Sequence, residues 1–350
     1  QLRSLAPGSR CIVISGDPER TAEEHGVEAV HRLDITGLWS ALRQGTVFIS
    51  GGGTLFQDVT SSRSLYYYLL MIVFAWSFGL PVIIYGQGIG PLRSRWNRLL
   101  TLKALGLARL VIVRDRKAYE QVLAWGFDGR RLCLGSDPVV TLKAESGRDS
   151  RRLICQSLGD KLVPQKPVLL VSLRPWPNLD ASLPAVAGVL DELSREGWQV
   201  VFVPFQFEAD SPVCQRCAGL MEEAAFVWPE PLAVQETLAL FGEADYCLGM
   251  RLHALIFAAV QRVPMLGLVY DPKVESFLRE LGLGDAAFNL PLDEGRSIDG
   301  KELLSSLHYL QAERERLVEQ IDQRVEEMAA RVSKANRRME EELAVVGVRV

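Results

Sequence analysis

Short apolar runs alternate with helix-like patterns through residues 11–134. The runs predict strands at 11–15, 46–50, 82–85, 110–114 and 131–134. Between them, apolar side chains recur at helical spacing near 36–44, 62–78, 94–107 and 115–126. Strands that alternate with helices predict a parallel sheet covered by helices on both faces.

The same alternation restarts after a polar stretch at 142–166, which is rich in Lys, Arg, Ser and Gly and is typical of a linker. The second half predicts strands at 168–173, 199–204, 246–249 and 265–269. Its predicted helices lie at 183–196, 210–224, 232–242, 252–261 and 273–282, and a charged helical tail runs from 299 to 343.

The chain therefore predicts an α/β fold of two Rossmann-like domains that face each other across a cleft, with a long C-terminal helical tail. We place the N-terminal domain at 1–150 and the C-terminal domain, with its tail, at 151–350. A length of 350 residues is sufficient for two separate cores. In open parallel sheets, ligands bind at the carboxyl ends of the strands.

Residues 64–92 carry no charge, and an apolar run of this length can span a membrane. However, Gly79 and Pro81 interrupt the run, and a strand-like segment follows them. A helix followed by a fully buried strand explains the pattern better, because interior strands of parallel sheets are apolar throughout.

Composition narrows the function classes. The chain has 39 Lys and Arg against 43 Asp and Glu, a net charge of −4, which argues against a general nucleic-acid binder.

Six cysteines are too few for a disulfide framework and fit a reducing compartment. Cys214 and Cys217 have metal-ligand spacing, but no second pair accompanies them, so we expect no metal.

The residues that follow the first-half strands suggest two binding segments. After strand 46–50 come three glycines, of which Gly52 and Gly53 allow close approach of a ligand to the backbone. Gln57 and Asp58 follow, and their amide and carboxylate groups suit sugar hydroxyls. The alternative is a tight turn with a helix cap. After strand 82–85, residues 86–91 form a glycine-rich turn before Arg93, which suits an anion at a helix start. The alternative there is a basic surface face.

Cations also follow the strands of the second half. Arg251 and His253 open an apolar helix after strand 246–249, and His253 is the one histidine at such a position. An imidazole there can act as an acid or base, or as a hydrogen-bonding partner. Lys273 follows strand 265–269, and Arg174 is a comparable cation after strand 168–173. The alternative for Lys273 is a solvated side chain in a first helical turn.

At these motifs the chain resembles the polysaccharide pyruvyl transferase family, in particular the branch that pyruvylates cell-surface glycans of S-layer-bearing bacteria. The matching segments are 50–58, 86–91, 249–254 and 271–273. That family usually begins with a strand and a glycine-rich Asn-x-Gly-Asp-Glu loop, which the chain lacks. We therefore expect the N-terminal domain to lack its first strand.

The resemblance implies a GT-B-like fold and transfer of the enolpyruvyl-derived group of phosphoenolpyruvate to a sugar. The product would be a pyruvate ketal, commonly on N-acetylmannosamine, with release of phosphate. The acceptor implied is a polyprenyl-diphosphate-linked saccharide of a secondary cell wall polymer, which places the enzyme in the cytoplasm at the inner face of the membrane. Phosphoenolpyruvate is a substrate, and no cofactor or metal is required.

The resemblance also assigns roles to residues. Arg93, His253 and Lys273 match the family's donor-binding arginine, histidine and lysine. We expect Arg93 and Lys273 to neutralise the donor, His253 to transfer protons, and Arg251 to support positioning. Asp58 is the candidate that activates or orients the acceptor hydroxyl, supported by Gln57, Gly52 and Gly53.

Two other functions stay open. A GT-B glycosyltransferase that uses a nucleotide sugar would need an acidic residue for the ribose, and Glu275 could serve. A catalytically silent glycan-binding relative is the other alternative. No amphipathic basic helix stands out in the sequence, so peripheral membrane contact and the oligomeric state stay undecided.

Overall fold

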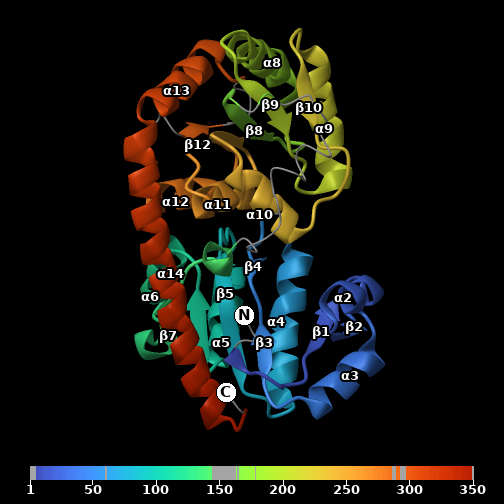
Figure 1. Cartoon of the computed structure of the whole chain (residues 1–350). Coiled ribbons are helices and arrows are strands. Elements are labelled where there is room, and N and C mark those ends of the chain that lie inside the picture. The colour runs from blue at the N-terminus through green and yellow to red at the C-terminus, as the bar shows by residue number, and fades with distance from the viewer. Residues whose placement is uncertain are drawn as a thin grey trace. The chain divides into compact units, whose positions relative to one another are not determined.

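The chain folds into two compact units (Figure 1), which we describe separately. The structure is a computed structural model that describes residues 5–59, 61–143, 163, 165–177, 179–285, 289–291 and 297–348. Unit 1 comprises Gln1–Pro138 and Met328–Val350, and unit 2 comprises Val139–Glu327.

Unit 1 contains a five-stranded parallel sheet. Strand β5 (Val82–Ile89) lies between β3 (Phe48–Ser50) and β6 (Leu110–Val113), and β7 (Leu132–Leu134) pairs with β6. Strand β4 (Gly53–Phe56) pairs with the second half of β5. A separate two-stranded parallel sheet consists of β1 (Ile12–Ser15) and β2 (Glu28–His31).

Alternate residues of the five-stranded sheet pack on opposite faces. Val82 and Ile84 belong to a core formed with α4 (Ser62–Ser77), α5 (Arg95–Gly106) and α6 (Arg116–Ala124). Ile83 and Tyr85 pack instead with Met339 of α14 (Arg314–Val345). This two-residue period follows from the pleat of a strand and gives the sheet helices on both faces. Helices α2 (Pro18–His25) and α3 (Ile35–Gln44) complete the unit.

The uncharged segment forms a helix followed by a buried strand, as the sequence predicts. Helix α4 ends at Ser77, Gly79 adopts a positive φ of 77°, and every residue of β5 is buried. Among the residues that the structure describes, no helix has both the length and the apolar character needed to cross a membrane.

Unit 2 contains a six-stranded parallel sheet with the spatial order β10-β9-β8-β11-β12-β13. Counted within the unit, this order is 3-2-1-4-5-6, the order of a Rossmann sheet. The strands are β8 (Val168–Ser172), β9 (Gln199–Phe202), β10 (Ala225–Val227), β11 (Tyr246–Gly249), β12 (Met265–Val269) and β13 (Asn289–Pro291).

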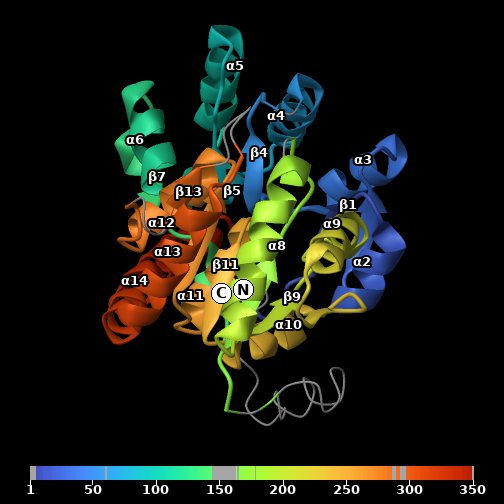
Figure 2. The ribbon, with the colours of Figure 1, turned by 90° about the horizontal axis from the view of Figure 1, so that it is seen from above.

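Two groups of helices enclose the sheet of unit 2 (Figure 2). Helix α8 (Leu179–Arg195) packs against α9 (Phe207–Leu220) and α13 (Gly300–Ala312). Helix α11 (Leu252–Val260) packs against α10 (Val234–Gly242) and α12 (Pro272–Glu280). The strand order reverses between β8 and β11, which is where Rossmann sheets bind ligands.

Most helix starts have a chemical cause in the sequence. Seven helices begin after an Asp or Ser whose side chain accepts a hydrogen bond from a first-turn backbone N–H, which satisfies a donor that the helix itself leaves unpaired. These capping residues are Asp17, Asp34, Ser61, Ser94, Asp115, Asp271 and Asp299.

The structure confirms the predicted α/β class with parallel sheets and a long C-terminal helical region, but it corrects three details. Strand β5 does not end at 85: it continues to Ile89, so the predicted turn at 86–91 is wrong for its first four residues. The compact units divide after Pro138, and residues 328–350 belong with unit 1, not with the C-terminal domain. The predicted boundary at 150 lies outside the described residues. Four short strands, β2, β4, β10 and β13, were not predicted.

Met339 tests the packing of the tail on unit 1. It is fully buried against the sheet. Met339→Ala should lower the free energy of unfolding by about 2–5 kcal/mol, because it leaves a cavity in a core. The measurement is urea denaturation followed by circular dichroism. Exposed Arg337 on the same helix is the control, and Arg337→Ala should change the value by less than about 0.5 kcal/mol. Equal effects would mean that the tail does not contribute to this core.

Candidate active site

In unit 1, the glycine segment that follows β3 is held by a buried amide. Gln87 is fully buried in β5, and its Nε2 donates to the backbone O of Gly51 and to Ser50 Oγ (3.4 Å). Its Oε1 accepts from the backbone N of Leu55 at 3.4 Å. The strand register shifts at this point, where β4 replaces β3 as the partner of β5. The Gln87 side chain thus replaces ladder hydrogen bonds that the backbone does not make.

The glycines themselves are needed for this path. Gly53 has φ +108°, a conformation that side chains with a Cβ rarely adopt. A Cβ on Gly86 would lie 4.0 Å from the Cα of Gly52, so two backbone segments pass close together. Gly51 and Gly52 are exposed. Their backbone is therefore open to solvent.

A nearly buried arginine anchors the same segment. Arg114 is 8% exposed; its Nη2 donates to Thr54 Oγ1 at 2.8 Å and its Nη1 to Asp137 Oδ2 at 3.1 Å. A Cβ on Gly88 would lie 3.1 Å from both Arg114 Nε and Thr54 Oγ1. Glycine at this position therefore leaves the room in which Arg114 reaches Thr54.

Asp58 joins the glycine segment to the start of α5. Its Oδ1 accepts from Arg93 N at 2.8 Å, and its Oδ2 accepts from Ser94 N at 3.1 Å and from Asn97 Nδ2 at 2.8 Å. Burial alone would raise the pKa of this carboxyl, but the hydrogen bonds from Arg93, Asn97 and Ser94 outweigh it and lower the pKa. This geometry favours orientation of the segment over proton abstraction by Asp58.

Gln57 and Arg93 flank this joint. Gln57 Oε1 accepts from the backbone N of Val59 at 2.9 Å. Arg93 is exposed, and within the described part of the chain its guanidinium has no hydrogen bond or ion pair. The side chain precedes the Ser94 cap of α5 by one residue. It is therefore a cation held in place by its backbone and open to an anion.

In unit 2, the carboxyl ends of β8 and β11 lie in register with each other and with Gly267, two residues before the end of β12. Ser172 of β8 is opposite Gly249 of β11, which in turn is opposite Gly267 of β12. The predicted cations follow directly: Arg174 after β8, Arg251 and His253 after β11, and Lys273 after β12. The topology thus brings these four residues to one edge of one sheet.

Arg251 is held by a buried carboxylate. Its Nε donates to Asp210 Oδ2 at 3.0 Å, its Nη2 donates to Asp210 Oδ1, and Nη2 also reaches Gln206 Oε1 at 2.8 Å. Asp210 is fully buried. A bidentate pair in this environment fixes the guanidinium, so Arg251 is best described as a positioning residue. It orients the start of α11, where it is the N-cap residue.

His253 and Lys273 occupy the first turns of neighbouring helices. His253 is exposed on α11, and Lys273 on α12 has its Nζ 3.3 Å from Asp271 Oδ2. Asp271 also accepts from the backbone N of Lys273 at 2.9 Å and caps the helix. Helix starts carry partial positive charge, which adds to the attraction of these side chains for an anion.

Arg174 belongs to an aromatic cluster at the same edge. Its Nη1 donates to the hydroxyl of Tyr270 at 2.8 Å, and its Cζ lies 4.7 Å from the Tyr270 ring centroid and 5.7 Å from that of Trp176. Cation–π contacts of this kind fix the guanidinium plane. The Ser172 hydroxyl nearby is buried without a hydrogen-bond partner in the described structure.

The cysteine pair of α9 is buried. Burial raises the pKa of Cys214 and of Cys217 to about 12, so neither is a thiolate at neutral pH. Across the described ranges no three His, Cys, Asp or Glu side chains group as metal ligands.

The structure therefore groups the predicted residues in two sets. Unit 1 brings Gly52, Gly53, Gln57 and Asp58 to the backbone of Arg93, and unit 2 brings Arg251, His253 and Lys273 to one sheet edge. Residues that sequence reasoning did not single out support both sets, namely Gln87, Asn97, Arg114, Asp210 and Tyr270. Arg114 could have been found, because it directly ends a wholly apolar strand; Asp210 lies in an ordinary helical pattern and gives no such signal.

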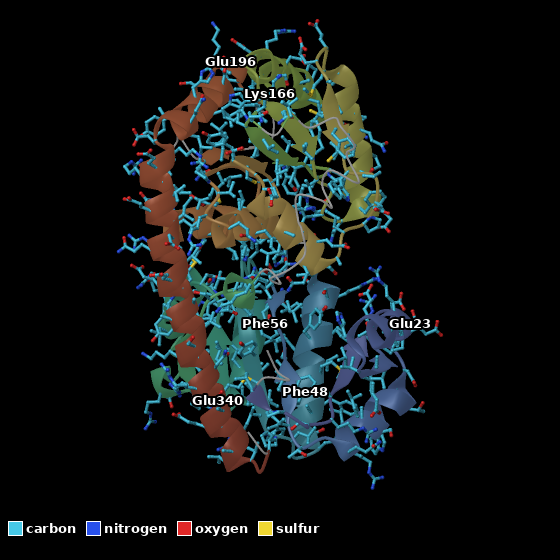
Figure 3. All side chains as sticks on the ribbon, viewed as in Figure 1. Glu23, Phe48, Phe56, Lys166, Glu196 and Glu340 are labelled. Atoms are coloured by element: carbon cyan, nitrogen blue, oxygen red, sulfur yellow. The ribbon has the colours of Figure 1, made fainter. Side chains whose placement is uncertain are left out.

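Asp58 predicts a pH-dependent contribution to stability. Since folding lowers its pKa, its contribution is complete above the unfolded pKa of about 4 and is lost as the pH falls through the lower, folded pKa. Asp58→Asn should lower the free energy of unfolding by about 1–3 kcal/mol at pH 7. The difference from the unmodified protein should shrink on acidification. Glu23→Gln, at an exposed position (Figure 3), is the control. A difference that is constant with pH would contradict the assigned hydrogen bonds.

The Asp210–Arg251 pair predicts a large effect in unit 2. Asp210→Ala should lower the free energy of unfolding by about 3–5 kcal/mol, because it leaves a nearly buried arginine without its counter-charge. The matched control uses the exposed pair of Arg216, also on α9, with Asp180. Asp180→Ala should cost about 0–1 kcal/mol. Thermal or urea unfolding measures both, and a small effect of Asp210→Ala would mean that Arg251 is not fixed by this contact.

Comparisons with known proteins agree with this fold. A glycosyltransferase from Rickettsia africae has a TM-score of 0.62 at 9% identity, covering 96% of this chain and 91% of that one. MnaA of S. aureus with UDP has a TM-score of 0.60 at 14% identity, covering 89% and 82%. HepE of Anabaena in complex with UDP-glucose has a TM-score of 0.58 at 13% identity, covering 93% and 88%. At these identities the likeness shows a shared GT-B-like fold and nothing more.

A comparison with curated proteins finds no match. The family model of polysaccharide pyruvyl transferases, in contrast, matches residues 3–272. The matched range contains Arg93, Arg251 and His253 and ends one residue before Lys273. Because it covers most of the chain, the protein belongs to the polysaccharide pyruvyl transferase family and is a transferase.

Proposed function

We propose that the protein transfers the enolpyruvyl-derived group of phosphoenolpyruvate to a sugar of a lipid-linked cell-wall polysaccharide precursor. The observation that carries the proposal is the family match together with two cations, Arg93 and Lys273, and the imidazole of His253, at helix starts that follow sheet edges. N-acetylmannosamine on polyprenyl diphosphate is the acceptor that we propose, at the cytoplasmic face of the membrane.

Phosphoenolpyruvate carries a phosphate and a carboxylate, and the chain offers matching groups. Arg93, whose guanidinium has no partner among the described residues, would bind one of these anions as a fork. Lys273 would bind as a mobile point charge, after exchange of its contact with Asp271. His253, on the first turn of α11, would donate to the phosphate or transfer a proton.

The chemistry balances without a further reactant. One acceptor hydroxyl proton reaches C3 of the donor, which becomes the methyl group, and an oxocarbenium-like centre forms at C2. Two sugar oxygens bond to C2, the bond from C2 to the phosphate oxygen breaks, and the second hydroxyl proton leaves with phosphate. The ketal therefore bridges two hydroxyls of one sugar. Stabilisation by Arg93 and Lys273 of the negative charge that develops on the departing phosphate should be the main catalytic contribution.

The glycine segment of unit 1 would bind the acceptor. Gly52, Gly53 and Gln57 offer backbone and amide groups to sugar hydroxyls, and Gln87 and Arg114 hold their backbone in place. Asp58 would orient this segment through its contacts with Arg93, Ser94 and Asn97. This refines the sequence-based role of Asp58, which included activation of the hydroxyl.

The second candidate is a glycosyltransferase that uses a nucleotide sugar. The Rossmann strand order of unit 2 and the similar fold of UDP-bound structures favour it. Its proposed ribose ligand, Glu275, accepts a hydrogen bond from Arg279 Nη2 at 2.6 Å and is thus engaged elsewhere. Lys273 of the pyruvyl transferase proposal is likewise paired, with Asp271, so ion pairing alone does not separate the two candidates.

One experiment separates these functions. Lipid-linked disaccharides are incubated with the protein and either phosphoenolpyruvate or UDP-sugars, and the products are analysed by mass spectrometry. The proposal predicts a pyruvate ketal mass increment and stoichiometric phosphate with phosphoenolpyruvate alone. A hexose increment with release of UDP would support the glycosyltransferase, and no product with either donor would support the silent relative.

Substitution of any one of the three donor residues should lower the rate of pyruvyl transfer. Arg93→Ala, His253→Ala and Lys273→Ala should each lower kcat/KM about a hundredfold or more, because each removes a charge contact in the transition state. His308 provides a matched histidine control: it contacts Glu196 at 2.9 Å (Glu196 is labelled in Figure 3) on the surface of unit 2. His308→Ala should retain full phosphate release. Full activity of His253→Ala would remove that residue from the mechanism.

A further inference from the structure

Two neighbouring helices of unit 1 expose large apolar side chains. On α5, Trp96 is 65% exposed, and Leu99 and Leu100 are 41% and 45% exposed. On α4, Leu70 is 64% exposed, with Tyr66 and Val73 also exposed. We call these six residues, with the adjacent Arg63, Arg95, Arg98 and Lys103, the α4–α5 patch.

Helical periodicity places each set in one stripe. On α5, Trp96, Leu99, Leu100 and Lys103 follow a spacing of three and four residues, which is one side of a helix. Arg63, Tyr66, Leu70 and Val73 form the same pattern on α4. The opposite sides of both helices already fill the core of unit 1. The stripes are therefore not used by the fold.

The two stripes are adjacent. Helices α4 and α5 contact each other, and the Tyr66 hydroxyl donates to Asn97 Oδ1 at 2.9 Å. Both helices belong to the core on the same face of the five-stranded sheet, and Figure 2 shows them on one side of β4 and β5. The apolar side chains thus form a single surface and not two isolated ones, which distinguishes them from ordinary scattered exposure.

The charged residues of α4 and α5 are all of one sign, positive. No Asp or Glu occurs in residues 59–114, whereas the same range, Arg114 included, contains seven Lys and Arg, in a chain of net charge −4. Two of the seven are paired with acids elsewhere, Arg109 with Glu342 and Arg114 with Asp137. Among the described residues, Arg95 and Lys103 make no ion pair, and Arg98 lies 5.7 Å from the ring centroid of Trp125. The charged side chains of both helices are therefore all basic, and the adjoining acid is Asp58, which accepts from Asn97 at the start of α5.

We propose that the α4–α5 patch binds the surface of an anionic lipid bilayer. Leucine and valine side chains can enter the boundary between headgroups and acyl chains, tryptophan and tyrosine prefer that boundary, and the cations attract anionic headgroups. A symmetric contact between two copies of the chain fits less well, because it would place these cations against one another. A nucleic acid would not require the exposed leucines.

The patch adjoins the candidate acceptor segment. Asn97 of α5 donates to Asp58, and the backbone of Arg93 does the same. A membrane-bound patch would therefore hold the glycine segment near the bilayer surface, where a polyprenyl-linked sugar is displayed. This consequence rests on the proposed function, whereas membrane binding itself does not.

The test is co-sedimentation of the full chain with vesicles that contain neither donor nor acceptor. The protein should bind equimolar phosphatidylcholine–phosphatidylglycerol vesicles, bind pure phosphatidylcholine weakly, and dissociate in high salt. The double variant Arg95→Gln/Lys103→Gln should lower the partition coefficient roughly tenfold to thirtyfold. Trp96→Ser/Leu100→Ser should weaken binding to both vesicle types. All four positions are exposed, so circular dichroism should show unchanged folding.

The matched control replaces exposed apolar residues of unit 2. Leu220 and Val234 are 49% and 56% exposed, and Leu220→Ser/Val234→Ser should bind vesicles as the unmodified protein does. Equal binding of the patch variants, or no binding of the unmodified protein to anionic vesicles, would overturn the proposal. Sedimentation equilibrium supplies the other outcome: a loss of dimer in the Trp96→Ser/Leu100→Ser variant would make the patch a contact between copies.

An activity assay on a soluble acceptor that lacks the polyprenyl chain distinguishes failure of the membrane-binding proposal from failure of the proposed pyruvyl transfer. The Arg95→Gln/Lys103→Gln variant should form the ketal on this acceptor at the normal rate and lose activity only on the lipid-linked acceptor in vesicles. Vesicle binding without any ketal formation by the unmodified protein would leave membrane contact supported and reject the pyruvyl transfer. Equal activity of variant and unmodified protein on both acceptors would contradict a role of the patch in acceptor access.

Discussion

Every strand pair of the described structure is parallel, and this constraint decides where chemistry can occur. Parallel strands need crossover connections, and the carboxyl ends of β5, β11 and β12 each lead into a turn and a helix start. Backbone N–H groups at these starts have no partner within the helix and attract anions. The sequence uses these positions for Arg93, His253 and Lys273, which is why separate segments acquire the same chemical character.

The site residues differ in how firmly they are held. Gln87, Arg114 and the Arg251–Asp210 pair are buried or nearly so. Gln87 donates to the backbone of Gly51, Arg114 donates to the Thr54 side chain, and Arg251 donates to Asp210. Desolvated polar groups must be satisfied in this way, because an unpaired one is costly. Arg93 and His253 are exposed. The buried polar residues thus fix the loops, while the exposed cations remain accessible to a substrate.

Sequence patterns predicted the long elements well because each has a strong period or an unbroken apolar run. Strands 246–249 and 265–269 coincide with the observed bounds. The end of β5 was predicted wrongly because glycines such as Gly86 and Gly88 are typical of turns. In the structure, the absence of a side chain at these positions instead allows close contact with Gly52 and Arg114. The short strands carry too few residues for a period. Partners such as Asp210 and Asn97 could not be predicted, since their contacts depend on tertiary packing. The basic face at the start of α5 was named as an alternative, but the exposed apolar side chains of α4 and α5 were not predicted, because exposure is decided by the fold.

The proposed pyruvyl transfer depends first on binding of phosphoenolpyruvate by Arg93, His253 and Lys273. Isothermal titration of the full chain with phosphoenolpyruvate, in the absence of any acceptor, measures this binding alone. Arg93→Ala and Lys273→Ala should each raise the Kd at least about tenfold, which corresponds to the loss of about 1.4 kcal/mol. Arg130→Ala, on an exposed arginine paired with Asp128, should leave the Kd unchanged. An unchanged Kd in the Arg93→Ala protein would show that Arg93 does not bind the donor.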